Sequence, residues 1–234
     1  MRHLRIDVTR HEFDGYDILQ GISAVVNETD RIAVVGPNGA GKTTLMKIVT
    51  GEMKATEGSI ENAGGIGLGY LSQIHFDSES RSVFEELRLA FSDILNLEAE
   101  ISELETHLET DADIERYTTL LETFRMRSGF DYAREIDRVA RGLGIFHLLD
   151  NSIKEVSGGQ RTKVALAKIL LSRPNFLFLD EPTNFIDLAS VEWLEGYLQD
   201  TWKGGYMIIS HDREFLDACT TLTYEVFDGR LKIY

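Results

Sequence analysis

The sequence has few cysteines and lacks long apolar segments, and each absence argues against a class of protein. Its 234 residues include a single cysteine, Cys219, which cannot form an internal disulfide and therefore fits a reducing compartment. No run approaches the roughly 18 apolar residues that a membrane span needs. The start, MRHLRIDVTR, lacks the apolar stretch of a signal peptide. We therefore expect a cytoplasmic protein with no membrane segment of its own.

Positive charge is also scarce. Lys and Arg total 24 against 39 Asp and Glu, which gives a formal net charge of -15. Because binding to nucleic-acid phosphates relies on Lys and Arg, this balance disfavours a broad nucleic-acid interface. The acid is concentrated between Asp93 and Glu122, where ten acidic residues accompany one basic residue, Arg116.

Hydrophobic patterns predict strands alternating with helices toward both ends of the chain. Expected strands cover residues 4–9, 22–26, 31–35, 176–179 and 206–209, and a terminal hairpin covers 223–234. Expected helices cover residues 42–50, about 157–171 and about 189–198, the first ending at Gly51 as its C-cap. Such alternation favours an α/β fold, with a mainly parallel sheet covered by helices.

Residues 80–150 have a different character. Ser82 and Glu85 have the spacing of a capping box, and no proline interrupts residues 82–108. Apolar residues then recur by threes and fours, before and after a turn-like segment at 110–113: Ile94, Leu97, Ile101, Leu104, Leu108, Ile114, Tyr117, Leu121 and Phe124. We predict an acidic αα-hairpin over about 82–128, whose first helix runs from about 82 to 108 over roughly 40 Å.

One glycine-rich segment predicts a phosphate site. Gly36-Pro-Asn-Gly-Ala-Gly-Lys42-Thr43 fits the P-loop pattern G-x-x-x-x-G-K-[ST], after an expected strand and before an expected helix. Backbone N–H groups of such a loop close around phosphate oxygens, and the helix N-terminus adds partial positive charge. Lys42 would bridge the β- and γ-phosphates, and Thr43 would ligate Mg²⁺. The alternative is a glycine turn without a ligand. The expected nucleotide-binding residues here are Gly36, Pro37, Asn38, Gly39, Ala40, Gly41, Lys42, Thr43 and Thr44.

A second segment supplies carboxylates. The apolar run Phe176-Leu-Phe-Leu ends in Asp180 and Glu181, which places two acids at the edge of the expected sheet. Asp180 suits a Mg²⁺ site, and Glu181 is the candidate general base or water-orienting group for attack on a γ-phosphate. Two acids that merely end a strand are the alternative.

Further elements resemble those of ABC ATPases. Val156-Ser-Gly-Gly-Gln160 resembles the signature motif of that family, and Gln73 stands where the family has its Q-loop. Asp187 has D-loop spacing, and His211 matches the switch histidine. The resemblance implies a P-loop ABC domain with an antiparallel β subdomain, its core formed by residues 1–76 and 157–234 and its helical subdomain by 77–156. It also implies that Gln73 contributes to catalysis and to the metal site beside Thr43 and Asp180.

The segment Glu181-Pro-Thr-Asn184-Phe-Ile-Asp187 resembles the E-P-T-N-H-L-D motif of the ABC-F subfamily. The acidic hairpin also lies where the first domain of ABC-F proteins carries its arm. Two residues depart from the subfamily pattern, Phe185 in place of His and Ile186 in place of Leu.

The family resemblance implies a mechanism in which two ABC domains pair head to tail around two ATP molecules. One domain would give the P-loop, Glu181 and His211, and the facing one the signature residues Ser157, Gly158, Gly159 and Gln160. An aromatic ring usually stacks on adenine in this family. Phe13 aligns best, Tyr16 is the reserve, and a core role for Phe13 is the alternative. The other histidines, His11 among them, have no ligand spacing, and we expect no ligand role for them.

Three functions follow as hypotheses. The first is a tandem ABC-F protein acting on the ribosome. This chain, which has no second P-loop, would be its first domain, pairing with itself in isolation, and the acidic arm would meet a ribosomal protein or basic patch. The second is the ATP-binding subunit of a membrane transporter, and the third an ATP-gated clamp or scaffold with little turnover. The arm and Asn184 favour the first, and an intact Glu181 speaks against a degenerate site.

Overall fold

The computed structural model describes residues 2–71, 76, 78–127, 129, 131–184 and 186–234. The chain forms two compact units, which we describe separately. The first contains residues 1–75 and 173–234, and the second contains residues 76–172.

The first unit is built on a six-stranded sheet with the order β5-β6-β7-β3-β8-β9. All neighbouring strands run parallel except the final pair, β8 and β9, which form an antiparallel hairpin. The mainly parallel α/β sheet predicted from the sequence is thereby confirmed. The strands are β3 (Arg31–Val35), β5 (Leu68–Leu71), β6 (Phe176–Asp180), β7 (Gly205–Ile209), β8 (Leu222–Phe227) and β9 (Arg230–Ile233).

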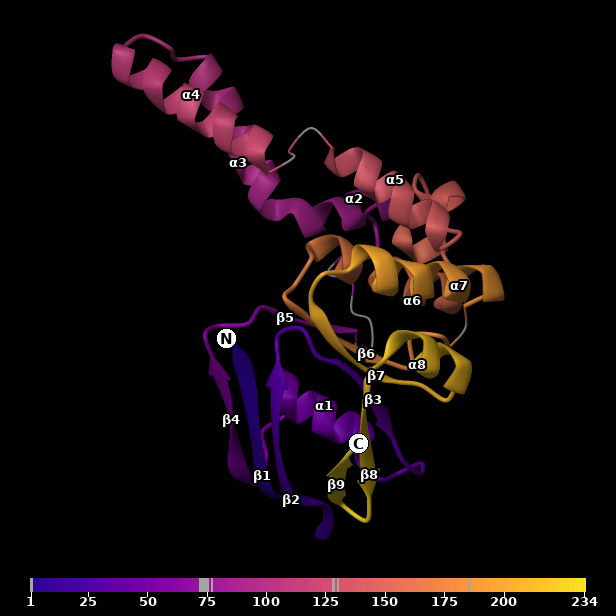
Figure 1. Ribbon diagram of the computed structural model, residues 1–234. Helices are drawn as coiled ribbons and strands as arrows, with labels where there is room; N and C mark the ends of the chain where they lie inside the picture. Colours follow the sequence, from indigo (N-terminus) through magenta and orange to yellow (C-terminus); the bar gives the residue numbers. More distant parts are fainter. Residues whose placement is uncertain (1, 72–75, 77, 128, 130, 185) are drawn as a thin grey trace. The chain divides into compact units, whose positions relative to one another are not determined.

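A smaller antiparallel sheet has the order β2-β1-β4, formed by β1 (His3–Phe13), β2 (Tyr16–Asn27) and β4 (Glu57–Ala63). Helix α1 (Lys42–Thr50) lies between the two sheets (Figure 1). Its buried residues Leu45, Met46, Ile48 and Val49 share one hydrophobic core with side chains of both sheets. The burial of these apolar faces is the main force that holds the helix and the sheets together.

Helix boundaries in this unit follow local signals. Helix α1 ends at Gly51, whose φ of 83° is left-handed and suits glycine, so the predicted helix and its C-cap are confirmed. Helix α7 (Leu188–Gly196) continues into a π-helix over Tyr197–Thr201. Helix α8 (Arg213–Cys219) begins at Asp212, whose carboxylate accepts a hydrogen bond from the Phe215 N–H.

The second unit is helical. Its α-helices are α2 (Val83–Arg88), α3 (Ser92–Glu105), α4 (Asp111–Met126), α5 (Tyr132–Gly142) and α6 (Gly158–Ser172), and 3-10 turns cover Leu89–Phe91, Phe146–Leu148 and Ile153–Glu155. The capping box of Ser82 and Glu85 is present, as predicted. Helix α6 packs with α2 and α5, so residues 158–172, which the sequence analysis assigned to the core, group with the helical elements.

Helices α3 and α4 form an αα-hairpin, which we call the arm (residues 92–126). The prediction of one unbroken helix over 82–108 is wrong. The 3-10 turn at Leu89–Phe91 separates α2 from α3, and at this break Phe91 and Arg88 both pack on the ring of Tyr132. Helix α3 also ends at Glu105, where the Thr106 hydroxyl donates to the Glu103 carbonyl.

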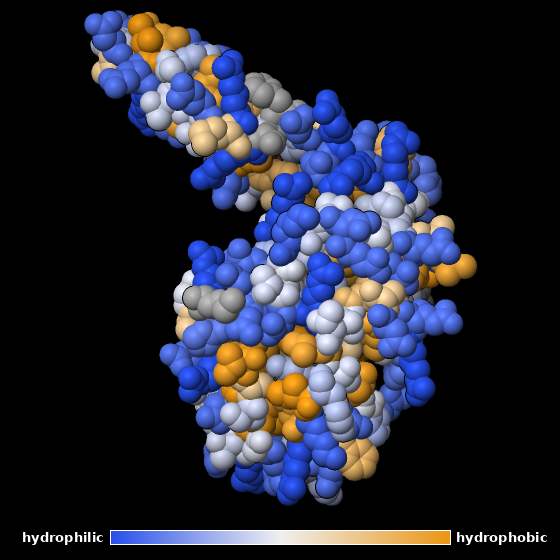
Figure 2. Space-filling model, viewed as in Figure 1, coloured by the Kyte–Doolittle hydropathy of each residue, from blue (hydrophilic) through white to orange (hydrophobic). Residues whose placement is uncertain are grey.

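The apolar seam of the arm closes only over part of its length. Ile101 and Phe124 are buried, whereas Leu108 and Ile114 near the tip are 42% and 52% exposed. On the face that Figure 2 shows, hydrophobic patches of the arm lie among hydrophilic residues. In the part of the chain that the structure describes, no helix has both the length and the apolar character required to cross a membrane.

Candidate nucleotide site

The loop between β3 and α1 has a backbone that its glycines make possible. Gly36, Gly39 and Gly41 have φ angles of 148°, 78° and 94°, in the region that L side chains rarely adopt. A Cβ at Gly36 would lie 2.1 Å from the carbonyl oxygen of Val226, and one at Gly41 would lie 2.7 Å from Cδ2 of Leu19. The neighbouring strands therefore hold this loop against the sheets.

Helix α1 presents its N-terminus to the loop. Its N-cap residue, Gly41, provides no side-chain cap, and its first turn contains no acidic residue. The first backbone N–H groups of a helix have no partner inside it, and the helix dipole makes this end partly positive. The Lys42 ammonium adds a full charge and donates to the carbonyls of Gly36 (2.9 Å) and Pro37 (3.0 Å). This arrangement favours an anion.

Two acids follow strand β6 at the same edge of the sheet. Asp180 is the last residue of β6, and Glu181 follows with a left-handed φ of 51°. The Glu181 N–H donates to the carbonyl of Ile209 at the end of the adjacent strand β7 (2.9 Å). Because β6, β7 and β3 are adjacent and parallel, their carboxyl ends place these residues beside the glycine loop.

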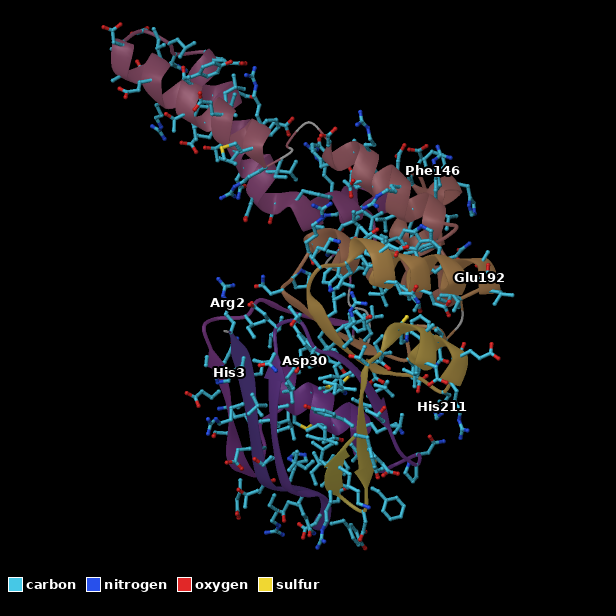
Figure 3. All side chains as sticks on the ribbon, viewed as in Figure 1. Arg2, His3, Asp30, Phe146, Glu192 and His211 are labelled. Carbon is cyan, nitrogen blue, oxygen red and sulfur yellow. The ribbon has the colours of Figure 1, made fainter. Side chains whose placement is uncertain are left out.

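His211 is paired with Glu181. Its backbone N–H donates to Oε2 of Glu181 (3.3 Å), and its Nε2 lies 3.4 Å from Oε1. The His211 side chain is 65% exposed, and Figure 3 shows it at the surface near α8. The hydroxyl of Thr183, in the loop after β6, lies 3.1 Å from the hydroxyl of Ser210, which follows β7. This hydrogen bond links the two loops.

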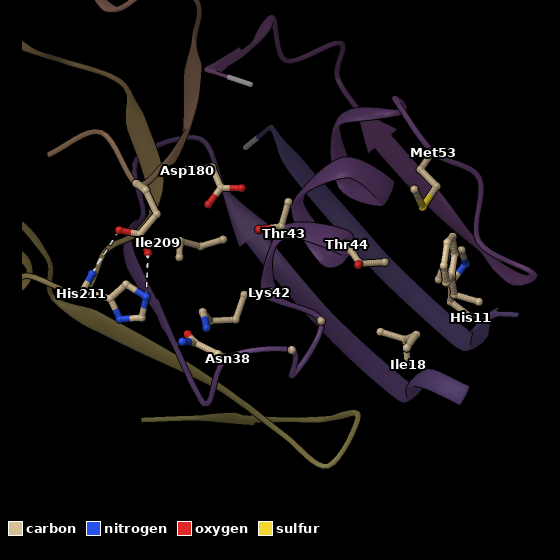
Figure 4. A pocket seen from close by; sticks show the side chains of 14 residues that line it. His11, Ile18, Asn38, Lys42, Thr43, Thr44, Met53, Asp180, Ile209 and His211 are labelled. Carbon is tan, nitrogen blue, oxygen red and sulfur yellow. Dashed lines mark hydrogen bonds and ion pairs between the residues drawn. The ribbon is translucent and has the colours of Figure 1, made fainter. Parts of the chain in front are cut away.

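These residues surround one cavity of about 520 Å³ (Figure 4). At one end lie Asp180 and His211, and at the other lie His11, Ile18 and Met53. Glu181 lies beside His211, with which it is paired. Of the predicted site residues, the cavity brings together Phe13, Asn38, Gly39, Gly41, Lys42, Thr43, Thr44, Asp180, Glu181 and His211. Gly36, Pro37 and Ala40 form the rest of the loop. Phe13 is 64% exposed and is therefore no core residue.

Other predicted residues lie elsewhere. Asp187 is the N-cap of α7, where its carboxylate accepts hydrogen bonds from the N–H and the hydroxyl of Ser190. The signature residues 157–160 belong to the second unit and open helix α6, with a reciprocal pair of hydrogen bonds between Ser157 and Gln160. Gln73 lies outside the described residues, and so does Phe185.

The sequence analysis missed four residues that line the cavity: His11, Ile18, Met53 and Ile209. Tyr70 on β5, which the sequence analysis did not name, lies within electrostatic reach of Asp180. Burial, and then the negative charges of Asp180 and Glu52, raise the pKa of the Tyr70 hydroxyl well above its ordinary value of 10.0. Tyr70 lies on a short strand on which only Leu71 is fully buried, so hydrophobic patterning gave no signal for it.

The donor set fits magnesium bound together with phosphate. The Asp180 carboxylate and the Thr43 hydroxyl both line the cavity and offer hard oxygen ligands. Among the described residues, no group of three or more His, Cys, Asp and Glu side chains gathers as a metal cage. Mg²⁺ needs no such cage, because it usually takes one or two protein ligands and completes its shell with water and phosphate oxygens.

Comparison with known proteins decides the family. The family model described as ABC transporter matches residues 19–184, which include the glycine loop, Asp180 and Glu181. The chain belongs to this ABC family. The loop 36–43 is therefore the P-loop of an ABC domain.

Relatives of this ABC domain include ABC-F proteins. ABC transporter F family member 5 of Arabidopsis thaliana is 32% identical over 97% of the chain and 34% of its own length. The energy-dependent translational throttle protein EttA of Escherichia coli is 36% identical over 86% of the chain and 37% of its own length. The uncharacterized ABC transporter ATP-binding protein YfmM of Bacillus subtilis is 33% identical over 100% of the chain and 46% of its own length. The chain thus spans less than half the length of these relatives.

Solved structures agree on the fold. The ATP-binding subunit of an ABC transporter superposes with a TM-score of 0.72 over 98% of this chain and 88% of that one, at 20% sequence identity. At this identity the similarity shows the ABC ATPase fold alone.

Proposed function

We propose that this ABC domain binds ATP together with Mg²⁺ and hydrolyses the bond to the γ-phosphate. The observation that carries the proposal is one cavity in which an uncapped helix N-terminus, Lys42 and a pair of acids meet. The first two attract a polyanion, and the acids supply a metal ligand and a base.

Each residue has a role that follows from its position. The P-loop amides and Lys42 bind the phosphate chain, and Phe13 stacks on the adenine ring. Thr43 and Asp180 would hold Mg²⁺, with Gln73 as a further ligand implied by the family. When bound, the ion neutralises phosphate charge and fixes the geometry of the phosphates.

Glu181 is the proposed general base. Its carboxylate is mostly buried, with 21% of the side chain exposed, and it lines the cavity beside the P-loop. It orients a water molecule and accepts its proton as the water attacks the γ-phosphate. His211, at 3.4 Å from Oε1, keeps that carboxylate in position. Phosphoryl transfer depends largely on positioning and charge stabilisation, and these groups are this domain's contribution to it.

A second ABC domain would complete the site. The family resemblance assigns Ser157 and Gly159 to the γ-phosphate of ATP held by the facing domain, with Asp187 at the same junction. Helix α6 begins after Ser157 with no acidic residue in its first turn, and Ser157 and Gly158 are exposed. These features suit an anion contact at a helix N-terminus. The partner is the second domain of a tandem protein, or a second copy of this chain in isolation.

For the whole protein we propose a role in translation, on the ribosome in the cytoplasm. The name of the relative EttA, a translational throttle, and the ABC-F relatives support this role over membrane transport. The arm, placed in the chain as in ABC-F proteins, supports it further. The solved transporter subunits bear on the fold only.

Substitution of Lys42 tests the proposal directly. Lys42→Ala removes charge-assisted hydrogen bonds to the phosphates, so we expect the affinity for ATP with Mg²⁺ to fall on the order of 100-fold in isothermal titration. Lys47→Ala is the matched control, because Lys47 carries the same charge in the last turn of α1. Unchanged affinity in Lys42→Ala would refute the phosphate site.

A further inference from the structure

His11 lies at the end of the cavity away from Asp180 and His211 (Figure 4). The phosphate chemistry proposed above does not use it. Its neighbours along the cavity wall are Ile18, Met53 and Phe13, so this end is mainly apolar and His11 is its polar group. The side chain is only 7% exposed. A mostly apolar pocket with one placed polar group is typical of sites that orient a ring-shaped ligand.

A change of register in the small sheet brings His11 to this place. Along β1, Leu4, Ile6 and Val8 face the core, and strict alternation would turn Arg10 inward next. The pairing with β4 shifts between Val8 and Arg10, so one extra residue of β1 is accommodated there. Beyond this bulge the buried position is His11, opposite the buried Leu19 of β2.

The two nitrogens of the His11 ring have different surroundings. Within the described part of the chain, Nδ1 is buried and has no hydrogen-bond partner. A buried N–H without an acceptor is costly, so the proton belongs on Nε2. Since the ring borders the cavity and its Nδ1 is buried, Nε2–H is the group available to donate a hydrogen bond to a ligand.

We propose that His11 is a specificity-determining residue that donates its Nε2–H to a ring nitrogen of the bound purine base. This inference rests on the proposed function, because the P-loop fixes the phosphates at one end and directs the base to the other. Phe13 contacts the face of the base, and His11 donates a hydrogen bond to its edge. The nucleotide thereby gains a directional contact that inorganic triphosphate lacks.

The test compares two variants with two ligands. In His11→Phe the ring volume is kept and the donor is lost, so the affinity for ATP is expected to fall about 3- to 10-fold. In His11→Gln the amide nitrogen reaches the place of Nε2, so most of the ATP affinity returns. Inorganic tripolyphosphate, which has no base, is expected to bind both variants and the unaltered chain equally. His107→Phe, on the exposed end of the arm, is the control.

The outcomes separate His11 from the phosphate site. ATP affinity unchanged in His11→Phe overturns the role of His11 and leaves the proposed function intact. Equal losses for ATP and tripolyphosphate in both variants also overturn it, because a ring that only supports the fold predicts that result. Failure of the unaltered chain to bind either ligand overturns the proposed function, and the role of His11 with it.

Discussion

Gly36 and Gly39 belong to the same loop and have different surroundings. A methyl group on Gly36 would meet the Val226 carbonyl at 2.1 Å, whereas a Cβ on Gly39 has nothing within 4 Å. Both have positive φ angles, 148° and 78°. The two glycines therefore separate the cost of the backbone conformation from the cost of a collision.

Substitution of each glycine by alanine tests this difference. Gly36→Ala combines backbone strain with overpacking against β8, and we expect the free energy of unfolding to fall by about 2–4 kcal/mol. Gly39→Ala carries the backbone term alone, about 1–2 kcal/mol. Urea denaturation of both variants is the measurement. Equal losses would show that strand β8 yields to the added methyl group without cost.

At the residue scale, the spacing of residues in the sequence predicted those at the phosphate end of the cavity. It did not predict those at the end where His11 lies. Lys42, Thr43 and Asp180 were predictable because the P-loop pattern and the strand-terminal acids are contiguous in sequence. His11 was not, because its inward position depends on how β1 pairs with β4 around one extra residue. Met53 reaches the cavity from a loop after α1, where no periodicity indicates a direction.

At the scale of elements, the arm shows which signals act locally. Its helix α4 begins at Thr110, where the Thr110 hydroxyl and the Asp113 carboxylate form the two halves of a capping box. This start was predictable as a turn. The break between α2 and α3 was not, because no local signal marks it and its residues pack on the ring of Tyr132, more than forty residues away in sequence.

The capping box at Thr110 makes the start of α4 sensitive to acid. Hydrogen bonds donated by the Thr110 side chain, and then by its backbone, lower the pKa of Asp113 below its ordinary value of 3.8. The stabilisation is therefore present above pH 3.8 and is lost as the pH falls through the lower pKa of the folded arm. At neutral pH we expect Asp113→Asn to speed amide hydrogen exchange over residues 111–116, with no difference from the unaltered chain once the carboxyl is protonated.

The control for this prediction is Asp111→Asn. It removes the same charge from the same helical turn and leaves the capping box in place. Faster exchange in Asp113→Asn alone identifies the cap as the cause. Equal exchange rates in the two variants would assign the effect to the helix dipole instead.

At the scale of the whole molecule, the ABC fold was predictable because its motifs stand in a fixed order along the chain. Each motif marks the end of a strand or the start of a helix, and right-handed crossovers between parallel strands leave few topologies. The grouping of α6 with the helical unit was not predictable, because it depends on side-chain packing with α2 and α5.

The proposed composite site predicts that ATP turnover depends on pairing. In isolation the chain is expected to hydrolyse ATP slowly, with a specific activity that rises with protein concentration, because Ser157 and Gly159 must come from a second copy. Lys42→Ala and Ser157→Arg should each be inactive. Mixed together they should regain activity, since one composite site combines the intact P-loop of one chain with the intact signature of the other. Brisk turnover at all concentrations, without complementation, would contradict the composite site.

The proposed role in translation predicts ATP-dependent ribosome binding by the full-length protein. Glu181→Gln removes the base that accepts a proton from water, so ATP persists and holds two ABC domains together. We expect this variant to co-sediment with ribosomes when ATP is present. Adding Lys42→Ala should release it, because without bound phosphates the domains do not stay paired. Absence of Glu181→Gln from the ribosome fraction would reject the ribosomal role but not the proposed ATP site. ATP binding and hydrolysis depend on residues 36–43 and 180–181, whereas binding to a ribosome depends on surfaces such as the arm.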